Sequence, residues 1–273
     1  MQEADQTNNN SNGPAAMRLS HVVFVVVLIG LGVIGLVKGD FAPGWSPVPE
    51  SLPGRLALTY LCDFVYLVCG VGLLWRRTAV LAARILFVYL LLWLLLLRVP
   101  WFIVAPQVGT WWPASSAAVM AGTAWILYWW LADGWDKRHF GFVTRDTGLR
   151  IARVLFGLGL IPFGLAHFLY MDATAPLVPG WLLFPVFWAY FTGGAFIAAG
   201  LAMIFGVYAR LAAALITLQF GLLTLLVWVP RVVAGSLTAF QWNEFFVSIL
   251  LTAAAWVVAD SCRDTPWLAM KSR

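Results

Sequence analysis

Eight long apolar segments constrain this chain more than any other feature of its sequence. Each approaches the length of about 20 residues that an α-helix needs to cross a bilayer. Lipid offers no partner for backbone polar groups, so such segments must be helical. The apolar runs do not alternate with polar residues, which excludes a transmembrane β-barrel. We therefore predict an all-α integral membrane protein with eight transmembrane helices, near 21–38, 57–75, 80–99, 114–132, 151–170, 183–205, 208–229 and 244–259.

The overall composition leads to the same class of protein. Hydrophobic residues make up 62% of the 273 residues and charged residues only 11%. Soluble domains usually carry about 25% charged residues. A water-soluble fold of this length could not bury so much apolar surface in one core. The bilayer is therefore the predicted main partner of this chain.

The two halves of the chain share a repeated pattern. Gly30-Leu31-Gly32 returns as Gly157-Leu158-Gly159, and Val99-Pro100 returns as Val229-Pro230 after a nearly equal separation in sequence. We interpret this near-constant offset as a tandem duplication, with four helices in each copy. Four spans return the chain to its starting side, so the copies are predicted to be parallel. They would be two four-helix bundles related by a pseudo-twofold axis along the membrane normal.

The basic residues predict the orientation of these helices. Of the 17 lysines and arginines, 13 fall on one side of the predicted spans and 4 on the other. An excess of positive charge marks cytoplasmic loops, so we predict a bacterial inner-membrane protein with both termini in the cytoplasm. The net charge of +5 is then a topology signal, and no nucleic-acid partner is predicted. The predicted organisation is a disordered polar tail (1–17), a first repeat (18–132), a charged cytoplasmic linker (133–150), a second repeat (151–262) and a cytoplasmic tail (263–273).

The two predicted outer loops carry related motifs, Pro43-Gly44-Trp45 and Pro179-Gly180-Trp181. Tryptophan is favoured at the level of the lipid headgroups. The loops are therefore interpreted either as interfacial segments that anchor helix ends or as a lid over an outward-facing cavity.

Asp63 is the clearest candidate functional residue, because an ionisable group at membrane depth is costly. The register that pairs Val99 with Val229 places Gly193 at the corresponding position of the second half, so the carboxylate is not repeated. Two interpretations stay open. Asp63 contacts a proton, ion or substrate, or it forms a structural ion pair with Lys38, Arg55 or Arg98.

Other candidate binding residues lie near the predicted outer ends of the helices. His167 is interpreted either as a hydrogen-bonded interfacial residue or as a quinone or proton contact, since histidine changes charge near neutral pH. Tyr60 and Tyr190 occupy equivalent positions, and they either line a shared pocket or are ordinary interfacial aromatics. Arg98 and Arg231 both flank the repeated Val-Pro. Glu244 begins the last helix, where its charge suits the helix dipole, and pairing with Arg231 is predicted.

Metal and haem ligation are not predicted for this chain. Cys62 and Cys69 are separated by about 10.5 Å along a helix, which is too far for a disulfide. The three histidines (His21, His139 and His167) are not paired at ligand spacing. No nucleotide-binding or hydrolase motif is present, so no catalytic residue is assigned and we lean away from an enzyme. Quinone is the one cofactor kept under consideration.

The pattern of each half resembles the DoxX/DoxD-like family of small bacterial membrane proteins. The segments that carry the resemblance in the second half are Gly164-Leu165-Ala166-His167-Phe168, Val178-Pro179, Trp188-Ala189-Tyr190-Phe191-Thr192-Gly193 and Arg210-Leu211-Ala212-Ala213. Gly35-Leu36-Val37-Lys38 and Gly70-Val71-Gly72-Leu73-Leu74 carry it in the first half. Family members generally have one such unit, so two fused units are a departure.

The resemblance implies an architecture and a link to redox chemistry, but no transferable catalytic residue. Some relatives are subunits of a thiosulfate:quinone oxidoreductase, and others are linked to oxidative stress. The leading hypothesis is a membrane component accessory to a redox system, which would associate with a membrane redox partner or with itself. The alternatives are a quinone-interacting subunit, with His167 and the two tyrosines in its pocket, and a small-solute or proton-coupled transporter that uses Asp63. In the space between the two halves, an apolar slot open to lipid would favour quinone, a polar cavity that reaches Asp63 would favour transport, and a filled, dry interface would favour a scaffold.

Overall fold

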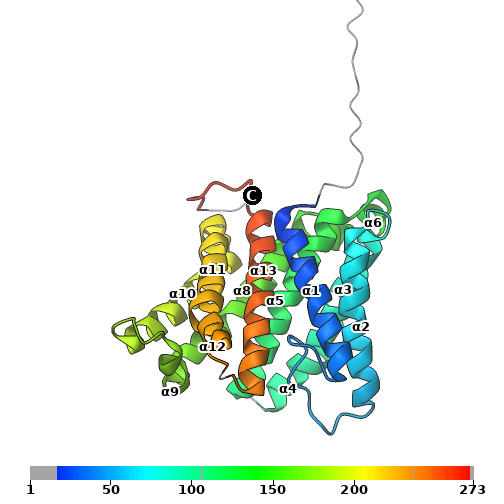
Figure 1. Cartoon of the computed structure of the whole chain (residues 1–273). Coiled ribbons are helices and arrows are strands. Elements are labelled where there is room, and N and C mark those ends of the chain that lie inside the picture. Colours follow the sequence, from blue (N-terminus) through cyan, green and yellow to red (C-terminus); the bar gives the residue numbers. More distant parts are fainter. Residues whose placement is uncertain (1–16, 106, 236, 271–273) are drawn as a thin grey trace, which may run out of the picture.

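The computed structural model describes residues 17–105, 107–235 and 237–270, apart from the side chains of residues 108 and 109. These residues form helices joined by short connections, and none of them lies in a strand (Figure 1). Most of the predicted tail, and the last three residues, lie outside the described residues. The elements are α1 (Leu19–Lys38), α2 (Arg55–Leu74), α3 (Ala79–Trp93), η1 (Leu94–Arg98), α4 (Val99–Val104), α5 (Val108–Leu131), α6 (Gly134–His139), α7 (Gly141–Thr144), α8 (Asp146–Leu169), α9 (Met171–Thr174), η2 (Ala175–Leu177), α10 (Pro185–Phe205), α11 (Ala209–Leu223), η3 (Thr224–Trp228), α12 (Val229–Val233) and α13 (Ala239–Ser261).

Seven of the helices in the described part of the chain are long and apolar enough to cross a membrane, as a multi-pass membrane protein requires. They are α1, α2, the continuous run Ala79–Val104, α8, α10, the continuous run Ala209–Val233 and α13. An eighth long helix, α5, has 24 residues. Its neighbours in sequence, α4 and α6, lie at opposite ends of the molecule (Figure 1).

The helix α5 differs from the seven apolar helices in its surroundings. Every residue from 115 to 128 is buried, so this part of α5 is surrounded by protein on all sides. A helix enclosed in this way has little contact with lipid. It can therefore carry Ser115, Ser116 and Thr123, of which Ser115 and Thr123 donate hydrogen bonds to the carbonyl oxygen four residues earlier.

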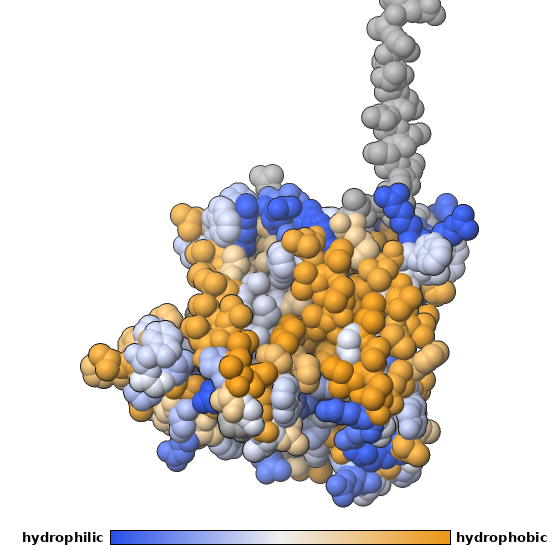
Figure 2. All heavy atoms as spheres, viewed as in Figure 1, coloured by the Kyte–Doolittle hydropathy of each residue, from blue (hydrophilic) through white to orange (hydrophobic). Residues whose placement is uncertain are grey.

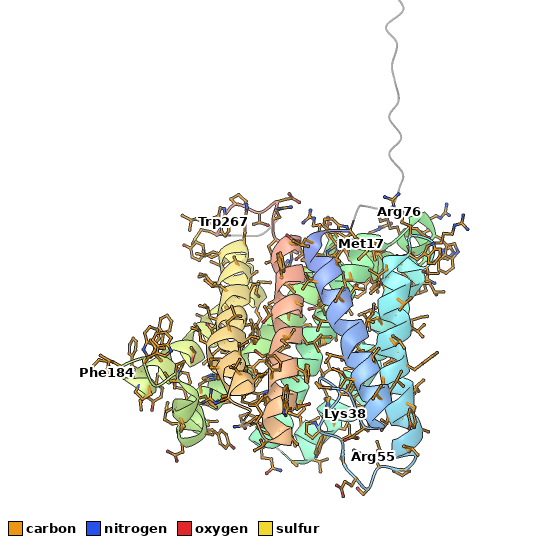
Figure 3. All side chains as sticks on the ribbon, viewed as in Figure 1. Met17, Lys38, Arg55, Arg76, Phe184 and Trp267 are labelled. Atoms are coloured by element: carbon orange, nitrogen blue, oxygen red, sulfur yellow. The ribbon has the colours of Figure 1, made fainter. Side chains whose placement is uncertain are left out.

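The molecular surface has an apolar band between two hydrophilic regions, as expected for a protein that spans a bilayer. Figure 2 shows an apolar band across the middle of the visible face, with hydrophilic residues gathered above and below it. Figure 3 shows Met17, Arg76 and Trp267 at one end of the molecule and Lys38 and Arg55 at the other. The first and last described segments therefore lie at the same end. Lipid is in contact with the apolar band of such a protein.

The helices pack as one continuous assembly and not as two separate bundles. Within the halves, α1 packs against α2, α2 against α3, and α3 against α5, and the same order joins α8, α10, α11 and α13. The first helix of each half, however, packs against the last helix of the other half: α13 covers α1, and α5 covers α8. The connection between α5 and α8 comprises residues 132–145 and includes the short helices α6 and α7.

The repeated Val-Pro dipeptides produce the same irregularity twice. The Val99 N–H donates to the Leu94 carbonyl oxygen, and the Val229 N–H donates to the Thr224 carbonyl oxygen. Each is an i→i−5 bond, so η1 and η3 are π-helical. Proline lacks an N–H, and its ring clashes with the carbonyl four residues earlier. The wider turn immediately before Pro100 and Pro230 accommodates the proline within a long helix.

The charged linker folds into two short helices, α6 and α7, at the end of the molecule where the described chain begins. Asp136 of α6 is buried and accepts hydrogen bonds from Arg84 (2.5 Å) and from the Tyr128 hydroxyl (2.7 Å). The indole N–H of Trp125 donates to the Val143 carbonyl (2.8 Å). These contacts fasten the linker to α3 and α5.

Asp133 gives the linker a pH-dependent contribution. Its carboxylate caps α6 by accepting the backbone N–H groups of Asp136 (2.9 Å) and Trp135 (2.8 Å), which lower the pKa of Asp133 below its ordinary value of 3.8. A depressed pKa stabilises the folded state above the unfolded pKa, and the stabilisation is lost as the pH falls through the folded pKa. Asp133→Ala is expected to lower the melting temperature at pH 7 and to change it less at pH 3. An equal loss at both pH values would contradict this role for the carboxylate.

Candidate functional site

The second half of the molecule contains a cavity of about 560 Å³. It lies among α8, α10, α11 and α13, with the segment from Thr174 to Leu182 at one end and Trp112 of α5 in the wall. Ligand pockets in proteins have volumes of about 300–1,000 Å³ and are mostly apolar, with a few polar groups. The cavity has the size and the composition of such a site.

Aromatic rings form the inner wall of the cavity. Phe163, Phe196 and Phe220 belong to three different helices, and their ring centroids are 5.1–6.1 Å apart. Trp112 meets Phe163 edge to face at 5.5 Å. Separations of this size are typical of packed aromatic pairs. The wall therefore offers flat apolar surfaces to an occupant.

Two ionisable residues and a few uncharged polar residues line the same cavity. His167 comes from α8 and Glu244 from α13, so two of the residues that the sequence singled out face one space. The Nδ1 atom of His167 lies 2.8 Å from the Phe163 carbonyl oxygen. A carbonyl can only accept, so Nδ1 carries the proton, and Nε2 of the neutral ring is a hydrogen-bond acceptor. Gln219 donates one amide N–H to the Thr192 carbonyl (3.0 Å) and retains a second N–H.

The cavity opens towards the lipid-facing surface. Its lining includes Phe191 of α10 and Leu218 and Leu222 of α11, and these side chains are exposed. Trp181 also lines the cavity, and it is 69% exposed. An amphiphile in the membrane could therefore reach the cavity from the bilayer. The apolar slot that would favour quinone was expected between the two halves, whereas this cavity lies among the helices of the second half.

In the first half, a tryptophan of the outer loop fills the corresponding space. Trp45 is fully buried (0% exposed). Its ring stacks on Tyr66 at 4.2 Å between ring centroids and meets Trp93 at 4.9 Å. Arg98 donates hydrogen bonds to the carbonyl oxygens of Trp45 and Pro47. Residues 41–45 of the first loop are thus part of the core, whereas Pro47, Pro49 and Glu50 further along the loop are exposed.

Arg231 holds the second outer loop in a different place. It donates to the carbonyl oxygens of Leu177 (3.3 Å) and Pro176 (3.1 Å), and also to that of Val227 (2.8 Å). Glu244 is within hydrogen-bond distance of Asn243 (3.4 Å). The predicted pairing of Glu244 with Arg231 is not formed, because the guanidinium binds backbone carbonyls instead.

Asp63 is fully buried and lies against Gly35 of α1. Its Oδ1 atom accepts the backbone N–H of Ala42 (3.0 Å), which ties the first outer loop to α2, and its Oδ2 atom has no partner. The expected ion pair is absent among the described residues: Arg55 pairs with Asp40 at 2.9 Å, and Arg98 holds the loop carbonyls. Lys38 is exposed at the outer end of α1.

Tyr60 and Tyr190 do not meet in a shared interior. Each is 45% exposed, and Tyr190 packs against Phe168 of α8 with the ring centroids 5.4 Å apart. Neither tyrosine belongs to the lining of the 560 Å³ cavity.

Sequence reasoning did not single out Trp112, Phe196 or Gln219. Gln219 carried a usable signal, because it is an uncharged polar side chain within an otherwise apolar span. Phe196 looks like any other apolar residue of α10. Its place in the cavity follows from helix packing, which the sequence does not specify.

Within the described residues, no group of three or more His, Cys, Asp or Glu side chains is placed to hold a metal ion. The comparisons with known proteins add no assignment. No protein-family model, no curated protein and no solved structure matches this chain.

Proposed function

We propose that this protein is a DoxX-like, internally duplicated protein of the bacterial inner membrane that binds a quinone in the cavity of its second half. It would serve as an accessory of a membrane redox system. The observation that carries the proposal is the apolar cavity, open towards lipid, with His167 and Glu244 in its lining.

Three observations support the architectural part of the proposal. The helix α5 runs between elements at opposite ends of the molecule, as an eighth span would. The segments η1 and η3 have the same length and occupy corresponding places in the two halves, each directly before a Val-Pro. The order of packing from α1 to α5 also matches the order from α8 to α13. With eight spans, and with the basic excess at the end shared by both termini, both termini lie in the cytoplasm.

The chemistry of His167 favours the reduced form of a quinone. Neutral His167 presents Nε2 as an acceptor, and a quinol hydroxyl is a donor, whereas a quinone carbonyl can only accept. The proposed role of His167 is therefore to accept a hydrogen bond from the quinol. Glu244 is a second polar contact at the same cavity, supplied by a different helix.

We expect the purified protein to retain quinone, and His167→Leu to lower the amount retained about tenfold, the effect of a lost hydrogen bond of ordinary strength. The measurement is the total quinone extracted per protein after purification from membranes that contain both benzoquinones and naphthoquinones. His167→Gln restores an acceptor and should recover part of the binding. Tyr190→Phe, outside the cavity lining, is the control. A protein that retains no more quinone than empty nanodiscs would refute the proposal.

The environment of Asp63 supports a structural role for this residue more than a role in transport. The carboxylate has no exposed surface, and it receives a backbone N–H from the outer loop. Transport coupled to Asp63 would need a route for water to this group.

A further inference from the structure

The side chains that surround Trp45 form a cage, and the residues at the corresponding positions of the second half surround the cavity. The rings that contact Trp45 belong to Tyr66, Tyr89 and Trp93. In the register that pairs Val99 with Val229, the corresponding residues of the second half are Phe196, Gln219 and Leu223, and all three line the cavity. The first half therefore holds the ring of Trp45 at this place, and the second half has the cavity at the corresponding place.

Side-chain size at three positions contributes to the space in the second half. Trp93 corresponds to Leu223, Tyr89 to Gln219 and Val65 to Ala195, so each position of the second half carries the smaller side chain. Leu223, Gln219 and Ala195 all line the cavity. These three smaller side chains leave room beside the cavity, although Phe220 and Trp228 of the lining are larger than Leu90 and Arg98 at the corresponding positions.

We propose that the cavity holds a flat aromatic headgroup of two fused rings, stacked on Phe196 as the indole of Trp45 stacks on Tyr66. This inference rests on the proposed function and names its ligand class, a naphthoquinone. The fused rings of an indole and of a naphthoquinone have similar outlines. Gln219, in the place of Tyr89, offers its second amide N–H to a carbonyl of the headgroup.

The rival occupant is Trp181, because Pro179-Gly180-Trp181 repeats Pro43-Gly44-Trp45. The arginine contacts distinguish the two loops. Arg98 binds the carbonyl of Trp45 itself, whereas Arg231 binds the carbonyls of residues 176 and 177, ahead of the motif. Trp181 is left at the cavity mouth, largely exposed. The inner cage is therefore available to a ligand.

The test compares two quinones without tails, menadione with two fused rings and duroquinone with one, bound to the full-length protein in nanodiscs. Empty nanodiscs give the baseline. Menadione is expected to bind about tenfold more tightly, because its second ring adds stacked area. Phe196→Leu should reduce menadione binding to the level of duroquinone. Phe205→Leu, on the same helix but exposed and outside the cavity lining, should leave both affinities unchanged.

The outcomes separate this inference from the proposed function. Equal affinities, or tighter binding of duroquinone, would overturn the two-ring site while leaving quinone binding intact. Binding of neither quinone, together with no retained quinone after purification, would overturn both. Trp181→Ala gives a second readout: unchanged or weaker menadione binding supports the inference. Stronger binding would show that Trp181 occupies the cage, and it would overturn the inference.

Discussion

Trp45→Ala is expected to lower the free energy of unfolding by about 3–5 kcal/mol, the usual cost of truncating a buried aromatic residue to alanine. Trp45 has no exposed surface and lies among the rings of Tyr66, Tyr89 and Trp93. Its removal leaves a cavity in the first half that the rigid helices around it can fill only in part. The measurement is reversible unfolding of the detergent-solubilised protein, followed by the loss of helical signal.

Trp181→Ala provides the matched control, since it makes the same chemical change in the same motif. Trp181 is 69% exposed, so its truncation should change the free energy of unfolding by about 0.5 kcal/mol or less. Similar losses for the two variants would mean that the two outer loops have the same environment, contrary to the structure.

Asp136→Ala is expected to lower the free energy of unfolding by about 3 kcal/mol, because breaking a buried ion pair by removing one partner typically costs about 3–5 kcal/mol. The lower end applies here because the Arg84 side chain is 28% exposed and regains some hydration. The substitution also leaves the Tyr128 hydroxyl without its acceptor. Thermal unfolding of the wild type and the variant at pH 7 measures the difference.

Lys137→Ala, at the next residue along α6, is the control for Asp136. Lys137 is exposed, and its truncation should change stability by less than about 0.5 kcal/mol. If the two variants were equally stable, the linker would not be fastened to α3 and α5 through Asp136.

The sequence predicts the long helices well, because a segment that crosses a bilayer must be both apolar and helical. The run at 21–38 became Leu19–Lys38, and the run at 183–205 became Pro185–Phe205. The repeated Val99-Pro100 and Val229-Pro230 do not by themselves predict the π-helical turns. Their geometry arises from fitting a proline into a helix that continues beyond it. The linker helices α6 and α7 were missed because their stability comes from contacts such as Arg84–Asp136, which join residues far apart in the chain.

The candidate site was predictable only in part. His167 and Glu244 stand out in the sequence as polar residues near the ends of spans, and both line the cavity. Asp63 stands out for the same reason, yet it is fully buried and does not line the cavity. Two identical Pro-Gly-Trp motifs do not reveal that Trp45 is buried and Trp181 is exposed. The difference depends on which loop carbonyls Arg98 and Arg231 reach.

The crossed packing of α5 over α8 and of α13 over α1 bears on how such a chain could have arisen. In a single four-helix unit, the first helix would still pack against the second, but its face that now meets the last helix of the other half would lose that contact. If the two halves are copies of one unit, two identical unfused units would have to pair in order to make the same crossed contacts. Fusion of two such units would keep the crossed contacts and allow the two copies to change in sequence independently. One copy could then keep a filled interior while the other acquired a cavity.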